Sequence, residues 1–232
     1  MLSVIIPTMW KYPPFLKFLN NLTQIDVVSE IILIDNEHDA CPTDLLPKSS
    51  KIKHYWWDSN IFVNPAWNFG VERSTNENIC ILNDDVIVDL KLFYDINNFM
   101  NNDNQFGTAG ICPGLLQYEQ PLFINGAIDI IPWDPGLYNN SSAGTRFGFG
   151  TLFFVKRKNW IPIPNEMRVY CGDDWVFETQ LRQGNINYLI TNCFFHTPYA
   201  QTTSLFSKEQ TNELMCKDIA VYGDAIVKVA IS

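Results

Sequence analysis

The stretch CILNDDVIVD, residues 80–89, runs an apolar segment directly into two adjacent acids, Asp84 and Asp85, which follow Asn83. A buried carboxylate costs free energy unless hydrogen bonds or a cation compensate its charge. Acids at the end of a strand therefore indicate either a turn, where Asp and Asn are common, or a metal site. The strands and helices predicted before and after this stretch help to decide between a turn and a metal site.

Residues 1–89 alternate between strands and helices. Short apolar runs rich in β-branched residues predict buried strands at residues 2–7, 30–36, 51–57 and 78–85. Apolar residues spaced three and four apart predict helices over 14–25, where Pro14 opens the first turn, and over 64–74. Strands that alternate with helices are typical of a parallel sheet, so we expect an α/β protein.

The pattern changes after Asp89. Strands are predicted within residues 106–113, 121–132, 147–157 and 187–195, and helices over 91–100, over 172–183 and from about Lys208. Strands that follow one another without a helix between them indicate a mixed or antiparallel second half. No linker, repeat or low-complexity block divides the chain, so we expect a single domain over 1–232.

The composition excludes several classes of protein. A chain of 232 residues with 47% hydrophobic and 18% charged residues can bury a sizeable core. A formal net charge of −9 and a pI near 4.7 argue against a nucleic-acid partner, because such binding relies on clustered Lys and Arg. No apolar run approaches the ~18 residues of a membrane span, and the N-terminus lacks a basic leader segment, so we expect a soluble, cytoplasmic protein.

The six cysteines are scattered, and no two of them form a C-x-x-C pair. A chain of this length does not need disulfides, so we expect reduced thiols, and the missing pairs argue against a structural zinc site. His38 and His54 lie in no setting that suggests a ligand. His196, in CFFHTPYAQ, follows a predicted strand and is either structural or a metal ligand.

Polar residues follow the predicted strands at three places: Thr8, Asp35 and the Asn-Asp-Asp cluster at 83–85. In open α/β sheets, ligands bind outside the carboxyl ends of the strands. Each place alone is explained by a turn or a helix cap, but together they favour a binding site. Neither a G-x-x-x-x-G-K-[ST] loop nor a G-x-G-x-x-G loop follows the first strand. A diphosphate could still bind through a cation that bridges carboxylate and phosphate oxygens.

A second pair of acids, Asp173 and Asp174, opens the helix predicted over 172–183. A helix N-terminus favours a carboxylate through capping and through the helix dipole, by about 0.3–1 kcal/mol. Two acids exceed what capping requires, which indicates a second role for this pair.

The order of these motifs resembles the nucleotide-sugar-dependent GT-A glycosyltransferases of the large inverting family. The resemblance spans about residues 2–205 and rests on SVIIPT, IILIDN, NPAWNFG, ILNDDV, GTLFFVKRKNW, GDDWVF and the late histidine. The chain is similar to small single-domain members of that family, from bacteria and large viruses, which build surface glycans. It implies a Rossmann-like, mostly parallel sheet, with a nucleotide-binding half over about 1–89, an acceptor half over about 105–205 and a helical tail over 206–232.

The resemblance also assigns residues to the donor and the metal. It implies that Thr8, Asp35 and Asn68 contact the nucleotide and that Asp84 lies near the ribose or the sugar. Asp85 and His196 would hold a divalent metal, Mn²⁺ or Mg²⁺. Asn83 stands where many relatives carry Asp.

For catalysis, the resemblance places the base at Asp174, and Asp173 replaces a Glu that helps to hold acceptor or sugar. Trp133, Asp134 and Tyr138 fall where an acceptor-binding loop is expected. The implied reaction is an inverting, metal-dependent transfer of a hexosyl or deoxyhexosyl group from a nucleoside-diphosphate sugar, with UDP as the expected nucleotide, to a hydroxyl of a glycan or glycoconjugate acceptor.

Two other functions remain open from the sequence. A sugar-nucleotidyltransferase also combines acids, a metal and an α/β sheet, but it needs a basic glycine-rich loop, and PTMWKYPP offers only Lys11. A non-catalytic carbohydrate-binding module would use stacking surfaces, which 7 Trp and 9 Tyr can provide, but it would not need a base.

Overall fold

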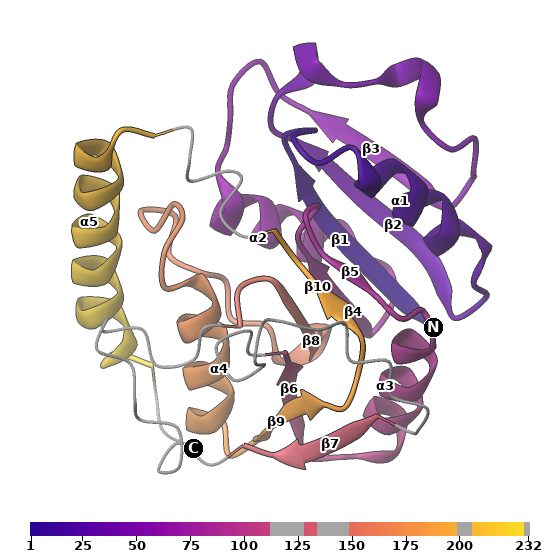
Figure 1. The fold of residues 1–232 in the computed structure, drawn as a ribbon. Coiled ribbons are helices and arrows are strands. Elements are labelled where there is room, and N and C mark those ends of the chain that lie inside the picture. Colours follow the sequence, from indigo (N-terminus) through magenta and orange to yellow (C-terminus); the bar gives the residue numbers. More distant parts are fainter. Residues whose placement is uncertain (112–127, 134–148, 199–205, 230–232) are drawn as a thin grey trace.

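The computed structural model describes residues 1–111, 128–133, 149–198 and 206–229. Its centre is an eight-stranded sheet with the order β3-β2-β1-β4-β8-β6-β9-β7 (Figure 1). These strands are β1 (Leu2–Thr8), β2 (Val28–Asp35), β3 (Ile52–Trp56), β4 (Asn78–Leu82), β6 (Phe106–Gly110), β7 (Asp129–Pro132), β8 (Leu152–Lys156) and β9 (Ile186–Thr191). The α-helices are α1 (Pro14–Gln24), α2 (Val63–Arg73), α3 (Lys91–Asn102), α4 (Gly172–Arg182) and α5 (Lys208–Ile226).

The N-terminal half of the sheet is parallel, as predicted. β1 pairs in parallel with both β2 and β4, and β2 pairs in parallel with β3. The register sets Thr8 beside Asp35 and Asp35 beside Trp56. The polar residues that end these strands therefore share one edge of the sheet.

The C-terminal half is mixed, which confirms the second prediction. β8 is antiparallel to β4 and β6, β6 is parallel to β9, and β7 is antiparallel to β9. A separate antiparallel pair, β5 (Ile87–Val88) and β10 (Phe195–His196), was not predicted, because two-residue strands carry no readable periodicity. The short 3₁₀ helices η1 (His38–Ala40), η2 (Thr43–Leu45) and η4 (Arg157–Asn159) were missed for the same reason.

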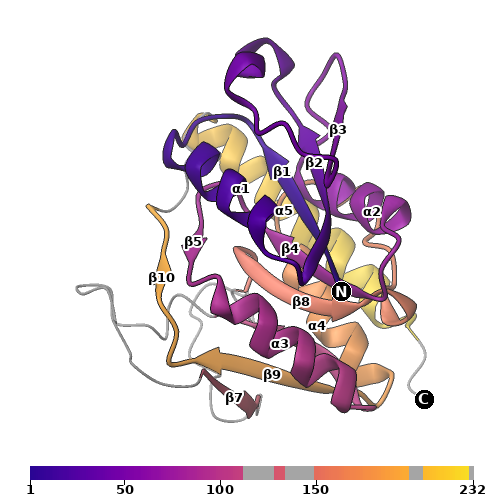
Figure 2. The ribbon, with the colours of Figure 1, turned by 90° about the vertical axis from the view of Figure 1, so that its right-hand side faces the viewer.

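Side-chain alternation along the strands divides the buried residues into two cores. Val4 and Ile6 of β1 pack on one face of the sheet with α1 and α3. Ile5 packs on the other face with α2 and α4. Figure 2 shows α1 and α2 on opposite sides of the parallel strands. The result is a three-layer α/β/α arrangement, which is what near-continuous apolar strands require.

Helix α2 lies unusually close to the sheet. A Cβ atom added at Gly70 would stand 2.3 Å from Ile5 Cγ2, so only glycine allows this approach. The contact packs the second half of α2 against the middle of β1, and the start of α2 borders the pocket described below. Within the described ranges, no helix combines the length and the apolar character that membrane crossing requires, and Cys41, Cys80, Cys171, Cys193 and Cys216 are all free thiols.

Candidate functional site

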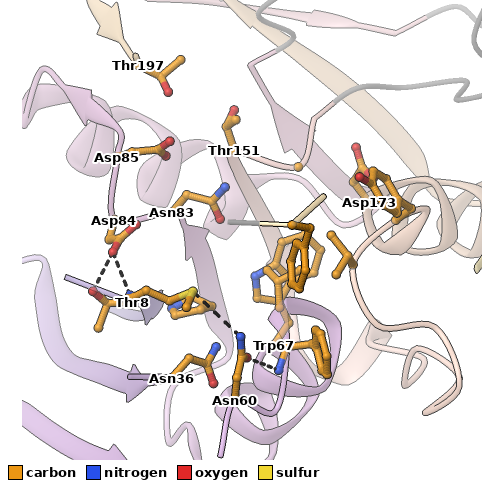
Figure 3. A pocket seen from close by; sticks show the side chains of 18 residues that line it. Thr8, Asn36, Asn60, Trp67, Asn83, Asp84, Asp85, Thr151, Asp173 and Thr197 are labelled. Atoms are coloured by element: carbon orange, nitrogen blue, oxygen red, sulfur yellow. Dashed lines mark hydrogen bonds between the residues drawn. The ribbon is translucent and has the colours of Figure 1, made fainter. Parts of the chain in front are cut away.

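A pocket of about 350 Å³ opens at the carboxyl ends of β1, β2 and β4 and reaches the start of α4. Its volume lies in the range of small-ligand sites. Its polar lining consists of Thr8, Asn36, Asn60, Asn83, Asp84, Asp85, Thr151, Tyr170, Asp173 and Thr197. Thr8, Asp84 and Asp85, which lie at or just after strand ends, thus face the same cavity as Asp173 of α4 (Figure 3).

The acidic side of the pocket is held by β1. Thr8 Oγ1 donates to Asp84 Oδ2 at 2.6 Å, and the backbone N–H of Met9 donates to the same oxygen at 3.2 Å. Asp85, with 7% of its surface exposed, is the next residue. Its Oδ1 is buried and has no hydrogen-bond partner in the described part of the chain.

The electrostatics of this pair favour a bound cation. Burial, and then the negative charge of Asp84, raise the pKa of Asp85 to about 6. Burial also raises the pKa of Asp84, against the lowering effect of the Thr8 hydroxyl. A divalent cation would remove both penalties, because it neutralises adjacent carboxylates and can take Asp85 Oδ1 as a ligand.

Asp173 lines the opposite side of the pocket, in the first turn of α4. Burial raises the pKa of Asp173, and the backbone N–H groups around it, including those of Phe149 and Gly150, oppose that rise. Asp174 is only 2% exposed and is not among the lining residues of the described chain. The N-cap residue of α4 is Cys171, which makes no side-chain capping bond, so neither acid serves as the N-cap that the sequence suggested.

The loop that leads into α4 is fixed by Asp218 of α5. This carboxylate is fully buried and accepts the backbone N–H groups of Arg168, Val169 and Tyr170 at 3.0, 2.8 and 2.8 Å. Val169 and Tyr170 line the pocket. The C-terminal helix therefore holds one wall of the site.

Two helices that border the pocket are each preceded by a residue with positive φ. Phe62, before α2, has φ 68°, and Cys171, before α4, has φ 60°. A Cβ atom added at Gly172 would lie 2.0 Å from Asn64 Oδ1, so the two helix starts touch. Backbone strain of this kind is concentrated at functional sites.

Besides Asp174, three predicted residues lie outside the lining: Asn68, His196 and Asp35. The Asn68 amide bonds with the backbone of Ile163, at 2.8 and 2.9 Å, and with Trp160 Nε1 at 3.2 Å. These contacts anchor the 160–163 segment to α2. His196 is exposed in β10 and pairs with Ile87, two residues after Asp85. Asp35 is fully buried, and its neighbour Asn36 lines the pocket instead.

Sequence reasoning missed several lining residues. Trp67 Nε1 and Thr151 Oγ1 are buried without a hydrogen-bond partner among the described residues. Thr197, which is 7% exposed, follows His196 directly. Trp67 lies in the NPAWNFG motif, and its position there was the available signal. Thr151 likewise lies in the GTLFFVKRKNW motif. Thr197 lies in no motif of the resemblance, and Thr is frequent in strands.

Of the expected acceptor-loop residues, Trp133 is 7% exposed and packs in the core beside Phe149, at a ring separation of 6.5 Å. Asp134 and Tyr138 lie outside the described residues.

No protein-family model and no curated protein matches the sequence. Solved structures do match it. GalNAc-T7 with UDP, GalNAc and Mn²⁺ aligns with a TM-score of 0.63 at 14% identity, over 98% of this chain and 50% of that one. S. aureus TarS 1-349 in complex with UDP-GlcNAc gives 0.60 at 13% identity, over 92% and 64%. The mannosyltransferase PcManGT from Pyrobaculum calidifontis, in complex with GDP-Man and Mn²⁺, gives 0.55 at 16% identity, over 80% and 53%.

The chain has the GT-A fold. Identities of 13–16% establish the fold and leave the activity to be argued from the site. The chain spans 50–64% of the length of these three proteins. The α/β fold class predicted from the sequence, with its parallel first half and mixed second half, is confirmed.

Proposed function

We propose that this protein is a metal-dependent, inverting glycosyltransferase, which transfers a sugar from a nucleoside-diphosphate donor to a hydroxyl of a glycan acceptor. One observation carries the proposal. Asp85, whose buried Oδ1 has no hydrogen-bond partner among the described residues, and Asp173 line the same pocket, on opposite sides. This chemistry needs both a site for the charge of the departing diphosphate and a base for the incoming hydroxyl.

The acidic side of the pocket suits a divalent cation. Asp85 is the central proposed ligand, because its Oδ1 has no other partner among the described residues and its pKa is raised by burial and by Asp84. His196 stays a candidate second ligand, since its strand pairing sets it beside Ile87. Carboxylate oxygens suit Mn²⁺ or Mg²⁺. A cation held there would supply the positive charge that stabilises the departing diphosphate.

We place the nucleotide at the edge formed by β1 and β2. Thr8 is held by its bond to Asp84, and the backbone N–H of Asn36 donates to the Thr8 carbonyl oxygen at 2.8 Å, so the two lining residues are positioned together. Trp67 Nε1 and Thr151 Oγ1 offer a donor and a hydroxyl with no partner in the described residues. Solved structures with the same fold contain UDP-GlcNAc, UDP and GDP-Man, which supports a nucleoside-diphosphate sugar as the donor class.

We assign the base to Asp173 rather than to Asp174, because Asp173 lines the pocket. Its carboxylate would take the proton of the acceptor hydroxyl while that oxygen forms a bond to the anomeric carbon. The bond from that carbon to the diphosphate oxygen breaks in the same step, and the diphosphate departs on the opposite side. Attack from the face opposite the leaving group inverts the anomeric configuration.

The decisive experiment has two arms. The chain, freed of metal with a chelator, is screened against a panel of nucleotide sugars with and without Mn²⁺, and thermal unfolding is followed. A donor at 100 times its Kd should add roughly 2.7 kcal/mol to the free energy of unfolding, and only with metal. The identified donor is then incubated with glycan acceptors, and the anomeric configuration of the product is read by NMR.

The alternatives give different results. A nucleotidyltransferase would be stabilised by a nucleoside triphosphate and would form a nucleotide sugar from a sugar phosphate. A binding module would bind glycans and leave the donor intact. Failure of every nucleotide sugar to stabilise the chain in the presence of Mn²⁺ would contradict the proposed donor class.

A further inference from the structure

A second group of metal-ligating side chains lies at the end of β2 and in β3. Asp35, His38, Cys41 and His54 each offer one ligand atom, and these four atoms all lie within 4.8 Å of one another. None of the four is among the lining residues of the pocket in the described chain. The group is therefore separate from the carboxylates of Asp84 and Asp85.

The carboxylate of Asp35 is oriented by its own neighbours. Its Oδ1 accepts from Trp10 Nε1 at 2.9 Å and from the backbone N–H of Glu37 at 3.0 Å. Its Oδ2 faces the histidines instead, at 3.1 Å from His38 Nδ1 and 3.2 Å from His54 Nε2. Such a division is typical of metal sites, where outer hydrogen bonds fix one oxygen of a carboxylate so that the other can act as a ligand.

The spacing of these atoms suits tetrahedral coordination. Zinc bonds to nitrogen and oxygen of about 2.0 Å place neighbouring ligands of a tetrahedron about 3.3 Å apart. The two separations from Asp35 Oδ2 to the imidazole nitrogens, 3.1 and 3.2 Å, are close to that value. The remaining separations, all within 4.8 Å, would have to shorten where they exceed the tetrahedral value when a cation binds at the centre of the group.

The ligand set also selects the kind of metal. Two imidazoles, one thiol and one carboxylate match the mixed nitrogen, sulfur and oxygen sets of zinc, whereas Mg²⁺ and Mn²⁺ prefer oxygen ligands. A thiolate and a carboxylate with two neutral imidazoles would balance a divalent charge. In the absence of a cation, burial and the nearby Asp35 raise the pKa of Cys41 to about 11, so binding of a metal must displace the thiol proton.

We propose that Asp35, His38, Cys41 and His54 form a Zn²⁺-binding site with a structural role, distinct from the cation site of the pocket. Four ligands fill a tetrahedral zinc shell and leave no open position for a reacting group, which is the pattern of structural sites. The metal would fasten η1 and Cys41 to the end of β2 and to the middle of β3.

The site would act on the pocket through one residue. Asn36 directly follows Asp35 and lines the pocket, and its side-chain Oδ1 accepts the backbone N–H of Ile61 at 3.3 Å. Fixing Asp35 therefore fixes the wall that the donor would contact. Asp35, which the resemblance assigns to the nucleoside, would then support donor binding indirectly.

The test uses Co²⁺, which replaces zinc and reports a bound thiolate by a charge-transfer band in the near ultraviolet. The full chain is reduced, stripped of metal and titrated with Co²⁺ and then Zn²⁺. We expect one equivalent of Co²⁺ with a thiolate band, displacement by Zn²⁺, and a higher midpoint of thermal unfolding in Zn²⁺. Cys41→Ala should abolish the band, and His38→Ala should weaken Zn²⁺ binding at least ~10- to 100-fold. Both residues are partly exposed, so the variants should fold.

Two controls separate the site from other cations and thiols. Cys216→Ala removes an exposed cysteine of α5, and Asp85→Asn removes the proposed ligand of the pocket. Both variants should keep the band and the Zn²⁺ affinity. A missing band in the unaltered chain, a band that survives Cys41→Ala, or a band lost in Asp85→Asn or Cys216→Ala would each overturn the proposal. Donor turnover is not part of the readout, so the result is independent of the proposed transferase activity.

Discussion

Asp218, buried in α5, accepts the backbone N–H of Tyr170, a residue of the pocket wall, at 2.8 Å. The two residues lie 48 positions apart in the sequence. Together with the bonds to Arg168 and Val169, this contact makes the C-terminal helix a support of the site.

We therefore expect Asp218→Asn to weaken both stability and donor binding. An Asn side chain has one acceptor oxygen in place of two, so at least one buried backbone N–H loses its partner, at a cost of about 1–3 kcal/mol. Chemical denaturation and donor titration would measure the two effects. Asp224→Asn, at an exposed position of the same helix, should change neither. If Asp218→Asn and Asp224→Asn had the same stability and the same donor affinity, Asp218 would not support the pocket wall.

Asp85→Asn should abolish Mn²⁺-dependent donor binding without harming the fold. The substitution keeps the size of the side chain and removes a charge that burial and Asp84 disfavour. We thus expect a free energy of unfolding, in the absence of metal, that equals or exceeds that of the unaltered chain. Calorimetry of donor binding with and without Mn²⁺, beside Asp89→Asn at an exposed position, is the measurement. Retained metal dependence in Asp85→Asn would place the cation elsewhere.

Local patterns were sufficient to predict the parallel strands and the acids that end them. The apolar runs that become β1, β2 and β4 are long enough to identify, and ligands in this fold class bind at strand ends. The strand-end argument named Thr8, Asp35 and residues 83–85; Thr8 and residues 83–85 line the pocket, whereas Asp35 does not. Asp173 was singled out only as one of two acids at a helix start and by the family resemblance.

Contacts between distant segments could not be predicted in the same way. Asp218 has no local signature, because its partners lie about 50 residues earlier in the chain. His54 lies in the middle of β3, and nothing in the sequence shows that it faces Asp35 of β2. The choice between Asp173 and Asp174 depends on the rotation of α4, which two adjacent acids do not reveal.

Glu30 should make the fold sensitive to strong acid. Burial alone would raise the pKa of Glu30. Hydrogen bonds from Lys53, Ser3 and Thr75 outweigh that effect and lower this pKa from 4.5 to about 2. A lowered folded-state pKa contributes stability that is complete above about pH 4.5 and is lost as the pH falls through about 2.

Glu30→Gln should remove that contribution, on the order of 2 kcal/mol after allowance for the partial exposure of Lys53, and should flatten the pH profile between about 2 and 4.5. Urea denaturation at several pH values measures it. Glu166→Gln, at an exposed position, is the control. Parallel profiles for Glu30→Gln and the unaltered chain would show that the network contributes nothing.

Substitution of Asp173 should lower the rate of transfer, whereas substitution of Asp174 should lower stability. Asp173→Asn keeps the size of the side chain but removes the proposed base, so kcat should fall by ~100- to 10,000-fold while the Kd of the donor is unchanged. The burial of Asp174 predicts that Asp174→Asn acts first on the free energy of unfolding.

Because burial raises the pKa of Asp173 and the base must be ionised, the rate of transfer at saturating metal should rise with pH. The midpoint of that rise should lie above the usual pKa of Asp, about 3.9. Rapid-quench transfer assays with a defined acceptor, beside denaturation of both variants, test this division. If Asp174→Asn loses transfer at unchanged stability while Asp173→Asn retains it, the base is Asp174, as the family resemblance alone would assign it.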